Sequence, residues 1–461
     1  LELALGVPLW LGYIVSAVAV IPLVTHGVRL ISRFQILTQP VWIILNILPF
    51  LFIFTLDWNK LSLWWSFAGA YEPANSIALL NVAKIGAASA VILALMTQIG
   101  EQVDFLRFVP AQDTASRRYR LSVFLAGPGW VVLGAPKLIA GSFLAVLALS
   151  IGVSADHAGE PAQMYAAAFG YMLPNETAAL LLMVVFVVVS QLKINVMNAY
   201  AGSLAWSNFF ARLTHSHPGR VVWLVFNVAI ALLLMELGIY RLLEQTLTVF
   251  SIVAMAWLST VSADLFINKP LGLAPDGIEF KRAHLYDVNP VGVGAMTLSG
   301  GTALAAHFGA FGDMAAALAP YLALIIAFVA APAIAWGTNG RYYLARRPRR
   351  SWSARDTITC SVCEHPFEPE DMAWCPAYAA PICSLCCSLD ARCHDLCKPK
   401  AHLRAQAQVV ADATLPSWAV ESLQTRLGRF GIAMALSLGM LAAILGMVYA
   451  FATRAAPDTA E

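Results

Sequence analysis

Residues 178–208 read AALLLMVVFVVVSQLKINVMNAYAGSLAWSN. An almost purely apolar run, 178–189, is followed at once by a lysine, a glutamine and several asparagines. If the run crosses a bilayer, amide and ammonium groups at that depth cost several kcal/mol unless they are paired or hydrated. The stretch therefore predicts one of two things. It is either a polar seam between packed helices, helped by Gly202 and Ser203, or the wall of a substrate path.

The composition of the whole chain indicates that this stretch lies in a membrane protein. The chain has 461 residues, of which 59% are hydrophobic and 12% charged, and its mean hydropathy is +0.70. Soluble domains carry roughly 25% charged residues. We therefore expect an all-α, polytopic integral membrane protein of the plasma or inner membrane, with the lipid bilayer as its main partner. The net charge of +2 gives no reason to expect a nucleic-acid partner, and we expect no enzyme activity.

Apolar runs long enough to span a bilayer recur along the chain. They cover residues 3–25, 37–56, 76–98, 121–150, 175–198, 219–240, 246–267, 290–311, 316–337 and 430–452. Lysine and arginine concentrate in every second connecting loop, which places those loops in the cytoplasm. Residue 1 then lies outside, as loss of an odd number of preceding helices would leave it. We therefore expect an N-terminally truncated chain.

The chain changes character near Arg341, where charged and cysteine-bearing sequence begins. We expect a membrane domain of about nine spans at 1–345, a cytoplasmic cysteine-rich module with its linker at 346–428, and an additional transmembrane helix at 429–453.

Side-chain amides are the best candidates for ligand recognition in the membrane domain, because they present paired donors and acceptors. Gln191 and Asn198 are seven residues apart and share one helical face, and Asn195 lies between them. Gln98, near the end of the third apolar run, is a further candidate for a cavity wall. Lys137, inside the fourth run, either lines a cavity or forms a buried ion pair.

All eight cysteines fall within 38 residues of the cysteine-rich module. They are Cys360, Cys363, Cys375, Cys383, Cys386, Cys387, Cys393 and Cys397. Two C-x-x-C pairs in a reducing compartment indicate metal binding rather than disulfides. We expect two zinc sites and no organic cofactor. One site would use Cys360, Cys363, Cys383 and Cys386, and the other the remaining four. His365 or His394 could replace a cysteine, and an iron–sulfur cluster or a redox relay stays an alternative. His215 and His217 fit a solvated loop better than a metal site.

Three short motifs resemble the nucleobase:cation symporters, the permeases of cytosine, uracil, allantoin and hydantoin. The Asp104-Phe105-x-Arg107 run resembles the exit of that family's sixth helix. Residues 195–208 resemble its eighth helix, and residues 263–266 resemble the exit of its tenth. The resemblance covers about residues 1–345. The cysteine-rich module is foreign to the family.

The resemblance implies a broken-helix, inverted-repeat transporter fold of the LeuT type, here lacking its first three helices. It implies that Asn198 contacts a nucleobase. Leu95 falls where the family has an aromatic residue that stacks on the base. Lys193 falls at or beside the place where sodium-coupled relatives hold sodium. Its ammonium either acts as a built-in cation there or extends to the cytoplasmic interface.

Two functions follow from these expectations. The first is transport of a purine- or pyrimidine-like nucleobase or related heterocycle by alternating access. The second is a transporter-like sensor, whose cysteine-rich module relays occupancy by a small heterocyclic ligand to a signalling partner or to a further C-terminal domain. A membrane-anchored finger of the ubiquitin-ligase kind has only the cysteine spacing in its favour.

Overall fold

The computed structural model describes residues 6–67, 82–106, 116–127, 129–214, 218–236, 240–352, 355–389 and 393–428, with isolated positions between 430 and 446. The chain is mostly helical and divides into two compact units. The membrane unit comprises residues 1–274 and 291–339, with 388–390. The cysteine-rich unit comprises residues 275–290, 340–387 and 391–461.

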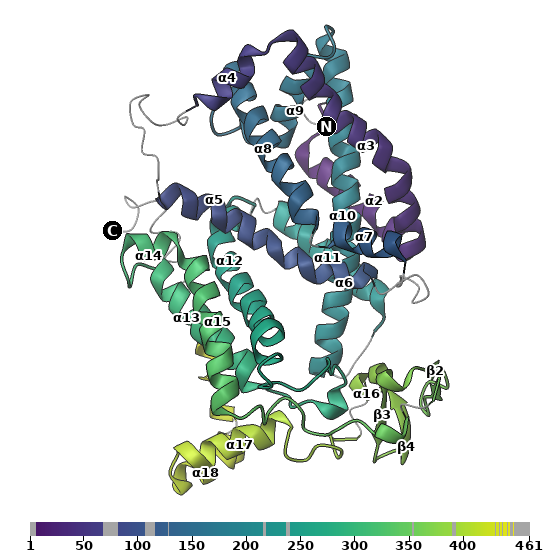
Figure 1. Cartoon of the computed structure of the whole chain (residues 1–461), viewed down its shortest axis with the longest axis vertical. Helices are drawn as coiled ribbons and strands as arrows, with labels where there is room; N and C mark the ends of the chain where they lie inside the picture. Colours follow the sequence, from purple (N-terminus) through teal and green to yellow (C-terminus); the bar gives the residue numbers. More distant parts are fainter. Residues whose placement is uncertain are drawn as a thin grey trace. The chain divides into compact units, whose positions relative to one another are not determined.

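Helix α10 (Glu176–Thr214) is the longest helix described in the membrane unit and contains the polar stretch 191–208. It begins after Asn175, whose side-chain oxygen accepts a hydrogen bond from the backbone N–H of Ala178 at 3.1 Å. Helix α10 packs against α2 (Leu9–Thr25), α3 (Val28–Leu56), α9 (Pro161–Gly170) and α11 (Arg220–Glu236) (Figure 1).

The seam between α10 and α11 is close because Gly202 has no side chain. A Cβ at this position would lie 2.9 Å from Nδ2 of Asn227 on α11. Asn227 is held in place by Trp206, whose Nε1 donates to Asn227 Oδ1 at 3.1 Å. Ser203 is fully buried beside this seam. The packing-seam interpretation of residues 202–206 therefore holds for this part of α10.

The remaining helices of the membrane unit follow the apolar runs. They are α4 (Asn59–Trp65), α5 (Val82–Leu95), the 3₁₀ turn η1 (Met96–Gln98), α6 (Ile99–Leu106), α7 (Arg117–Ala126), α8 (Gly129–Ser150), α12 (Tyr240–Ala263), the π turn η3 (Asp264–Asn268), α13 (Pro290–His307), α14 (Asp313–Ala317) and α15 (Ala319–Gly337). Helix α7 ends at Ala126, and α8 begins at Gly129. A second interruption, η1, divides α5 from α6.

Five helices among the described residues are long and apolar enough to cross a membrane. They are Val28–Leu56, Val82–Gln102, Glu176–Ala211, Thr246–Asn268 and Ala319–Gly337. Two shorter apolar helices, Leu9–Thr25 and Gly134–Ser150, accompany them. The length and composition of these helices support the prediction of a helical membrane protein. The last expected span, 430–452, lies largely outside the described residues.

The cysteine-rich unit contains two small antiparallel hairpins. β1 (Ile358–Thr359) pairs with β2 (Pro366–Phe367), and β3 (Met372–Cys375) pairs with β4 (Ala380–Cys383). Helix α16 (Ser384–Leu389) follows β4 directly, and α17 (Leu403–Thr414) and α18 (Ser417–Gln424) come later. The core of the unit consists of cysteines with a few apolar side chains, including Ala283 from the segment 275–290.

Candidate metal centre and candidate ligand cavity

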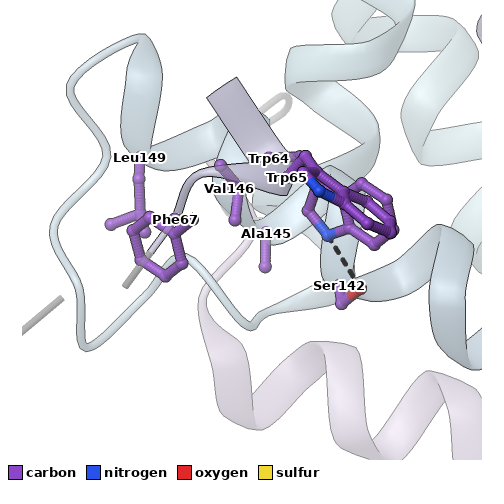
Figure 2. A pocket seen from close by; sticks show the side chains of 7 residues that line it. All are labelled: Trp64, Trp65, Phe67, Ser142, Ala145, Val146 and Leu149. Atoms are coloured by element: carbon purple, nitrogen blue, oxygen red, sulfur yellow. Dashed lines mark hydrogen bonds between the residues drawn. The ribbon is translucent and has the colours of Figure 1, made fainter. Parts of the chain in front are cut away.

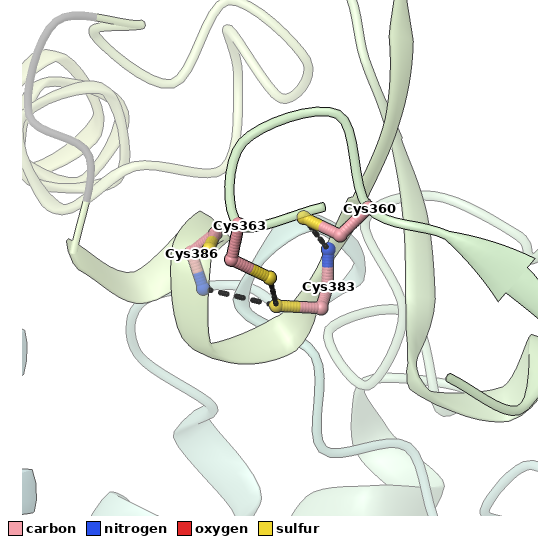
Figure 3. Close-up of side chains that lie close together, drawn as sticks. All are labelled: Cys360, Cys363, Cys383 and Cys386. Atoms are coloured by element: carbon pink, nitrogen blue, oxygen red, sulfur yellow. Dashed lines mark hydrogen bonds between the residues drawn. The ribbon is translucent and has the colours of Figure 1, made fainter. Parts of the chain in front are cut away.

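Four cysteines of the cysteine-rich unit form a cluster that could hold a metal ion (Figure 3). Cys360 and Cys363 lie on the turn between β1 and β2, whereas Cys383 ends β4 and Cys386 lies in the first turn of α16. Their four Sγ atoms all lie within 4.8 Å of one another, and those of Cys363 and Cys383 are 4.0 Å apart. Tetrahedral zinc with Zn–S bonds of about 2.3 Å needs sulfurs about 3.8 Å apart. The predicted first ligand set is therefore brought together.

Backbone N–H groups point at the sulfurs of this cluster. Cys360 Sγ accepts from the N–H of Cys383 at 3.3 Å and of Val362 at 3.5 Å. Burial raises the pKa of the Cys360 thiol, but hydrogen bonds from the N–H groups of Cys363, Cys383 and Val362 outweigh it, and the pKa falls to about 7. Burial, followed by the neighbouring Cys383 thiol, raises the pKa of Cys386. One thiolate forms readily here, while a second needs a cation to offset the repulsion.

The other four cysteines also belong to one core. Cys375 and Cys387 are buried, and Cys393 and Cys397 pack against the same cluster of side chains. Burial raises the pKa of Cys387 to about 12, helped by the negative charges of Cys397, Cys393 and Cys375. These thiols are therefore near enough to influence one another's ionisation. Neither His365 nor His394 is drawn into the first cluster, and His365 Nδ1 lies 2.6 Å from the carbonyl oxygen of Cys363.

The segment 275–290 connects η3 to α13 along the chain, yet it packs within the cysteine-rich unit. Arg282 Nη2 lies 2.8 Å from Asp395 Oδ2, and Lys398 Nζ lies 2.5 Å from Asp287 Oδ1. Cys397 Sγ is 4.0 Å from the carbonyl oxygen of Ala283. The membrane domain predicted at 1–345 includes this segment, whereas in the structure it belongs to the cysteine-rich unit.

A network of buried charges forms within the same segment. The Glu279 carboxylate accepts from Lys281 Nζ at 2.9 Å and lies 2.8 Å from His284 Nδ1. Burial raises the pKa of Glu279, but the hydrogen bonds from His284 and Lys281 outweigh it and hold the pKa at about 2. The ionised Glu279 carboxylate thus connects Lys281 and His284 within the segment.

A cavity of about 540 Å³ lies in the membrane unit between α3, α8, α9 and α10. Its wall is mostly apolar and aromatic, as in small-molecule sites, but six side chains bring polar groups to it. These are Trp42, Asn46, Lys137, Tyr165, Ser190 and Gln191. The volume and this mixture of rings and polar groups suit a small planar ligand.

Hydrogen bonds within the wall fix several of these side chains. Trp42 Nε1 donates to Ser190 Oγ at 3.0 Å, and Asn46 Nδ2 donates to the carbonyl oxygen of Trp42 at 2.7 Å. The Tyr165 hydroxyl donates to Asn46 Oδ1 at 2.9 Å. The ring centroids of Tyr165 and Phe186, which both line the cavity, are 4.4 Å apart. The cavity is therefore lined by side chains whose positions are determined before any ligand binds.

The structure separates the five predicted site residues. Gln191 lines the cavity. Lys193 is buried, and its Nζ donates to α3. Asn198 is exposed, Asn195 is half-buried, and neither lines the cavity. Gln98 is half-buried in η1, on another part of the unit. Of the two roles considered for Lys137, the structure shows the cavity wall, and among the described residues no carboxylate pairs with it.

Sequence reasoning missed Trp42, Asn46, Tyr165 and Ser190. Trp42 and Asn46 are four residues apart in α3 and therefore share a face, which was a usable signal. Tyr165 lies in a helix too short to count as a span. The predicted motif residues Asp104 and Phe105 have side chains outside the described part of the structure, and Arg107, His215 and His217 lie outside the described residues altogether.

A second hollow, of about 510 Å³, has a different chemistry (Figure 2). Its walls come from α4, the residues just after it, and α8. The lining side chains are Trp64, Trp65, Phe67, Ser142, Ala145, Val146 and Leu149. The Ser142 hydroxyl already accepts a hydrogen bond from Trp64 Nε1 at 3.1 Å. This open, apolar surface offers little to a polar ligand and fits hydrocarbon.

Comparison of the chain with protein-family models, with curated proteins and with solved structures gave no match. The resemblance to nucleobase:cation symporters therefore stays a prediction that rests on the three sequence motifs.

Proposed function

We propose that the chain is a membrane transport protein for a purine- or pyrimidine-like heterocycle, built on a LeuT-type arrangement of helices and working by alternating access. The observation that carries this proposal is the cavity between α3, α8, α9 and α10. It combines aromatic side chains, which suit the faces of a planar ring, with amide groups, which suit the edges of a base.

The interruptions in the helices support the same proposal. Helix α5 passes through the 3₁₀ turn η1 before α6, and α12 ends in the π turn η3. Irregular backbone at membrane depth is tolerated where protein or a water-filled cavity satisfies its polar groups, as in the broken helices of transporters. Such turns also provide positions at which helix segments can move.

The test is uptake of labelled uracil and hypoxanthine by proteoliposomes containing the whole chain. We expect accumulation above empty liposomes, and we expect Gln191→Leu to reduce it because this variant removes the free amide from the cavity wall. Asn208→Leu is the control, since Asn208 is an exposed amide of the same helix that does not line the cavity. Equal loss in both variants, or no accumulation by the unmodified chain, would contradict the proposal.

A second candidate function is a membrane sensor, and a specific observation favours it. The segment 275–290 connects two helices of the membrane unit and packs within the cysteine-rich unit. A movement of those helices on ligand binding would therefore act on that unit through the chain itself. A sensor would bind the heterocycle without accumulating it, so binding and uptake measured on the same preparation separate the two functions.

For the cysteine-rich unit, we propose two zinc sites on the cytoplasmic side of the membrane. The tetrathiolate cluster supports the first site, and the shared core of Cys375, Cys387, Cys393 and Cys397 supports the second. Zinc suits closed sites of four thiolates. Elemental analysis of the whole chain should find about two zinc per chain, with about one remaining in Cys363→Ser and in Cys387→Ser. Two zinc in Cys387→Ser would show that Cys387 is not a ligand, one zinc in the unmodified chain would exclude the second site, and bound iron would contradict the assignment of zinc.

A further inference from the structure

The cavity of the membrane unit carries a positive charge without a counter-charge among the described residues. Lys137 projects from α8 and lines the cavity, with its Nζ 4.8 Å from the centroid of the Trp42 ring. The residues that line the cavity include no aspartate or glutamate. The Lys137 side chain is exposed in the structure, so a ligand can reach its ammonium. The aromatic face of Trp42 offsets only part of the cost of that charge within a bilayer. A charged side chain within a membrane span normally pairs with a group of opposite charge or marks a ligand or ion path.

Hydrogen bonds between side chains of the cavity wall occupy several of its acceptors, so the groups that remain for a ligand are mainly donors. Asn46 Oδ1 accepts from Tyr165, Ser190 Oγ accepts from Trp42, and the Trp42 carbonyl oxygen accepts from Asn46. Each of these acceptors therefore already receives one hydrogen bond from another wall group. The ammonium of Lys137 brings three N–H donors to the wall and no acceptor.

The remaining polar groups add further donors. Gln191 has no hydrogen-bond partner among the described residues, so its NH₂ group and its oxygen are both available. Asn46 keeps one N–H that its bond to Trp42 does not use. Free donors therefore outnumber free acceptors, and a neutral base with equal numbers of both would leave some of them unpaired at a cost.

We propose that this cavity selects an anionic planar heterocycle, whose negative charge contacts Lys137 and whose acceptor-rich edge contacts Gln191. The inference rests on the proposed function, because it assigns the class of ligand that binds in the same cavity. It predicts an anionic ligand there in place of a neutral base. The negative charge can belong to a soluble heterocyclic acid or to the headgroup of an anionic lipid. The wall favours the soluble acid, because rings and amides line a hollow of about 540 Å³ that suits a small planar molecule.

The experiment uses the whole chain in phosphatidylcholine nanodiscs and equilibrium binding of two matched pairs of probes. Orotate is compared with uracil, and urate with hypoxanthine, because each pair shares a ring system and differs in charge near neutral pH. We expect at least one anion to bind about tenfold more tightly than its neutral partner, since a hydrogen bond to a charged group is about twice as strong as a neutral one.

Three variants assign the effect to the ammonium. Lys137→Gln should weaken binding of the anion by about tenfold and change binding of the neutral base by less than about twofold. Lys137→Arg keeps the charge and should retain most of the preference. Lys60→Gln is the control, because Lys60 is a lysine of the same unit that lies outside the cavity and contacts Asp57 and Ser150 instead. A second set of nanodiscs containing phosphatidylglycerol tests competition by an anionic headgroup.

The outcomes separate this inference from the proposed function. Neutral bases that bind at least as tightly as the anions, with no effect of Lys137→Gln, would overturn the inference and leave transport of a heterocycle intact. Anion binding that depends on Lys137, without accumulation in proteoliposomes, would support the inference and contradict transport. Displacement of the anions by phosphatidylglycerol would reassign the site to a lipid headgroup and overturn the soluble ligand. Failure of all four probes to bind would overturn both.

Discussion

Lys193 and Gln35 exchange two hydrogen bonds between α10 and α3. Lys193 Nζ donates to the carbonyl oxygen of Gln35 at 3.1 Å, and Gln35 Nε2 donates to the carbonyl oxygen of Lys193 at 2.9 Å. The same ammonium donates to Thr38 Oγ1 at 3.0 Å. Pro40 follows in α3 and interrupts its backbone hydrogen bonds. The buried ammonium thus connects two long helices through oxygens of the kind that also bind cations.

Replacing Lys193 by methionine should destabilise the membrane unit, because the variant keeps the apolar stem and removes the ammonium. The oxygens of Gln35 and Thr38 lose their donor, and we expect a loss of about 1–3 kcal/mol. Thermal unfolding in detergent measures this loss. Lys84→Met in α5 is the comparison, since Lys84 is exposed. An equal effect of the two substitutions would show that the contact between α10 and α3 contributes little.

Ligand binding should be independent of sodium. A fixed ammonium at about 4 Å from a sodium ion, with an effective dielectric constant near 20, opposes sodium binding by roughly 4 kcal/mol. Affinity for the heterocycle is measured with sodium and with choline as the only cation, and we expect the same value in both. Lys193→Thr should create a sodium response, because it replaces the charge by a hydroxyl ligand. Sodium-dependent tightening in the unmodified chain would show that Lys193 does not substitute for a cation.

Substitution of Gly86 tests the packing of α5. A Cβ at Gly86 would lie 2.1 Å from the backbone oxygen of Ala317, the last residue of α14, so Gly86→Ala forces backbone to move. We expect a clear drop in the unfolding temperature. Gly134→Ala in α8 is the matched control, since a Cβ there meets nothing within 4 Å. The control should be neutral or stabilising by about 0.5–1 kcal/mol, because alanine favours helix over glycine.

The sequence predicted the positions of the helices better than the site, for a physical reason. Apolar runs and C-x-x-C spacing are local signals, so the helices and the cluster of Cys360, Cys363, Cys383 and Cys386 followed from them. The cavity depends on side chains from four helices, and of the residues predicted from the sequence only Gln191 and Lys137 line it. The packing of 275–290 within the cysteine-rich unit depends on ion pairs such as Arg282–Asp395 between residues far apart in the chain, and no local pattern records these.

The buried charges of segment 275–290 predict a pH dependence. The pKa of Glu279 is about 2, below its ordinary value of 4.5. Between about pH 2 and pH 4.5, the folded state therefore binds fewer protons at Glu279 than the unfolded state does. The contribution of Glu279 is complete above about pH 4.5 and is lost as the pH falls toward 2. The rate of amide hydrogen exchange in residues 275–290, followed as the pH is lowered, measures this loss of stability.

The matched variant for this measurement is Glu279→Gln, which resembles the protonated acid. At neutral pH the variant should exchange faster than the unmodified chain, because Lys281 and His284 lose the charge of their partner. The difference between the two proteins should shrink as the pH is lowered from about 5 to about 3. A difference that stays constant over this interval would mean that ionisation of Glu279 does not stabilise the segment.

Removal of metal should loosen the segment 275–290 together with the cysteines. Ala283 packs among the cysteine side chains, and Arg282 and Asp287 pair with Asp395 and Lys398, which flank Cys397. Because the core is small and half of its side chains are cysteines, we expect the metal to supply much of its stability. Chelation of the whole chain should therefore raise hydrogen exchange in 275–290 as well as in 358–398, and leave α3 unchanged. Cys387→Ser should reproduce the effect in 275–290 without a chelator. Rapid exchange in 358–398 alone, with 275–290 still protected, would show that the segment is held by its own ion pairs and does not report the state of the metal centre.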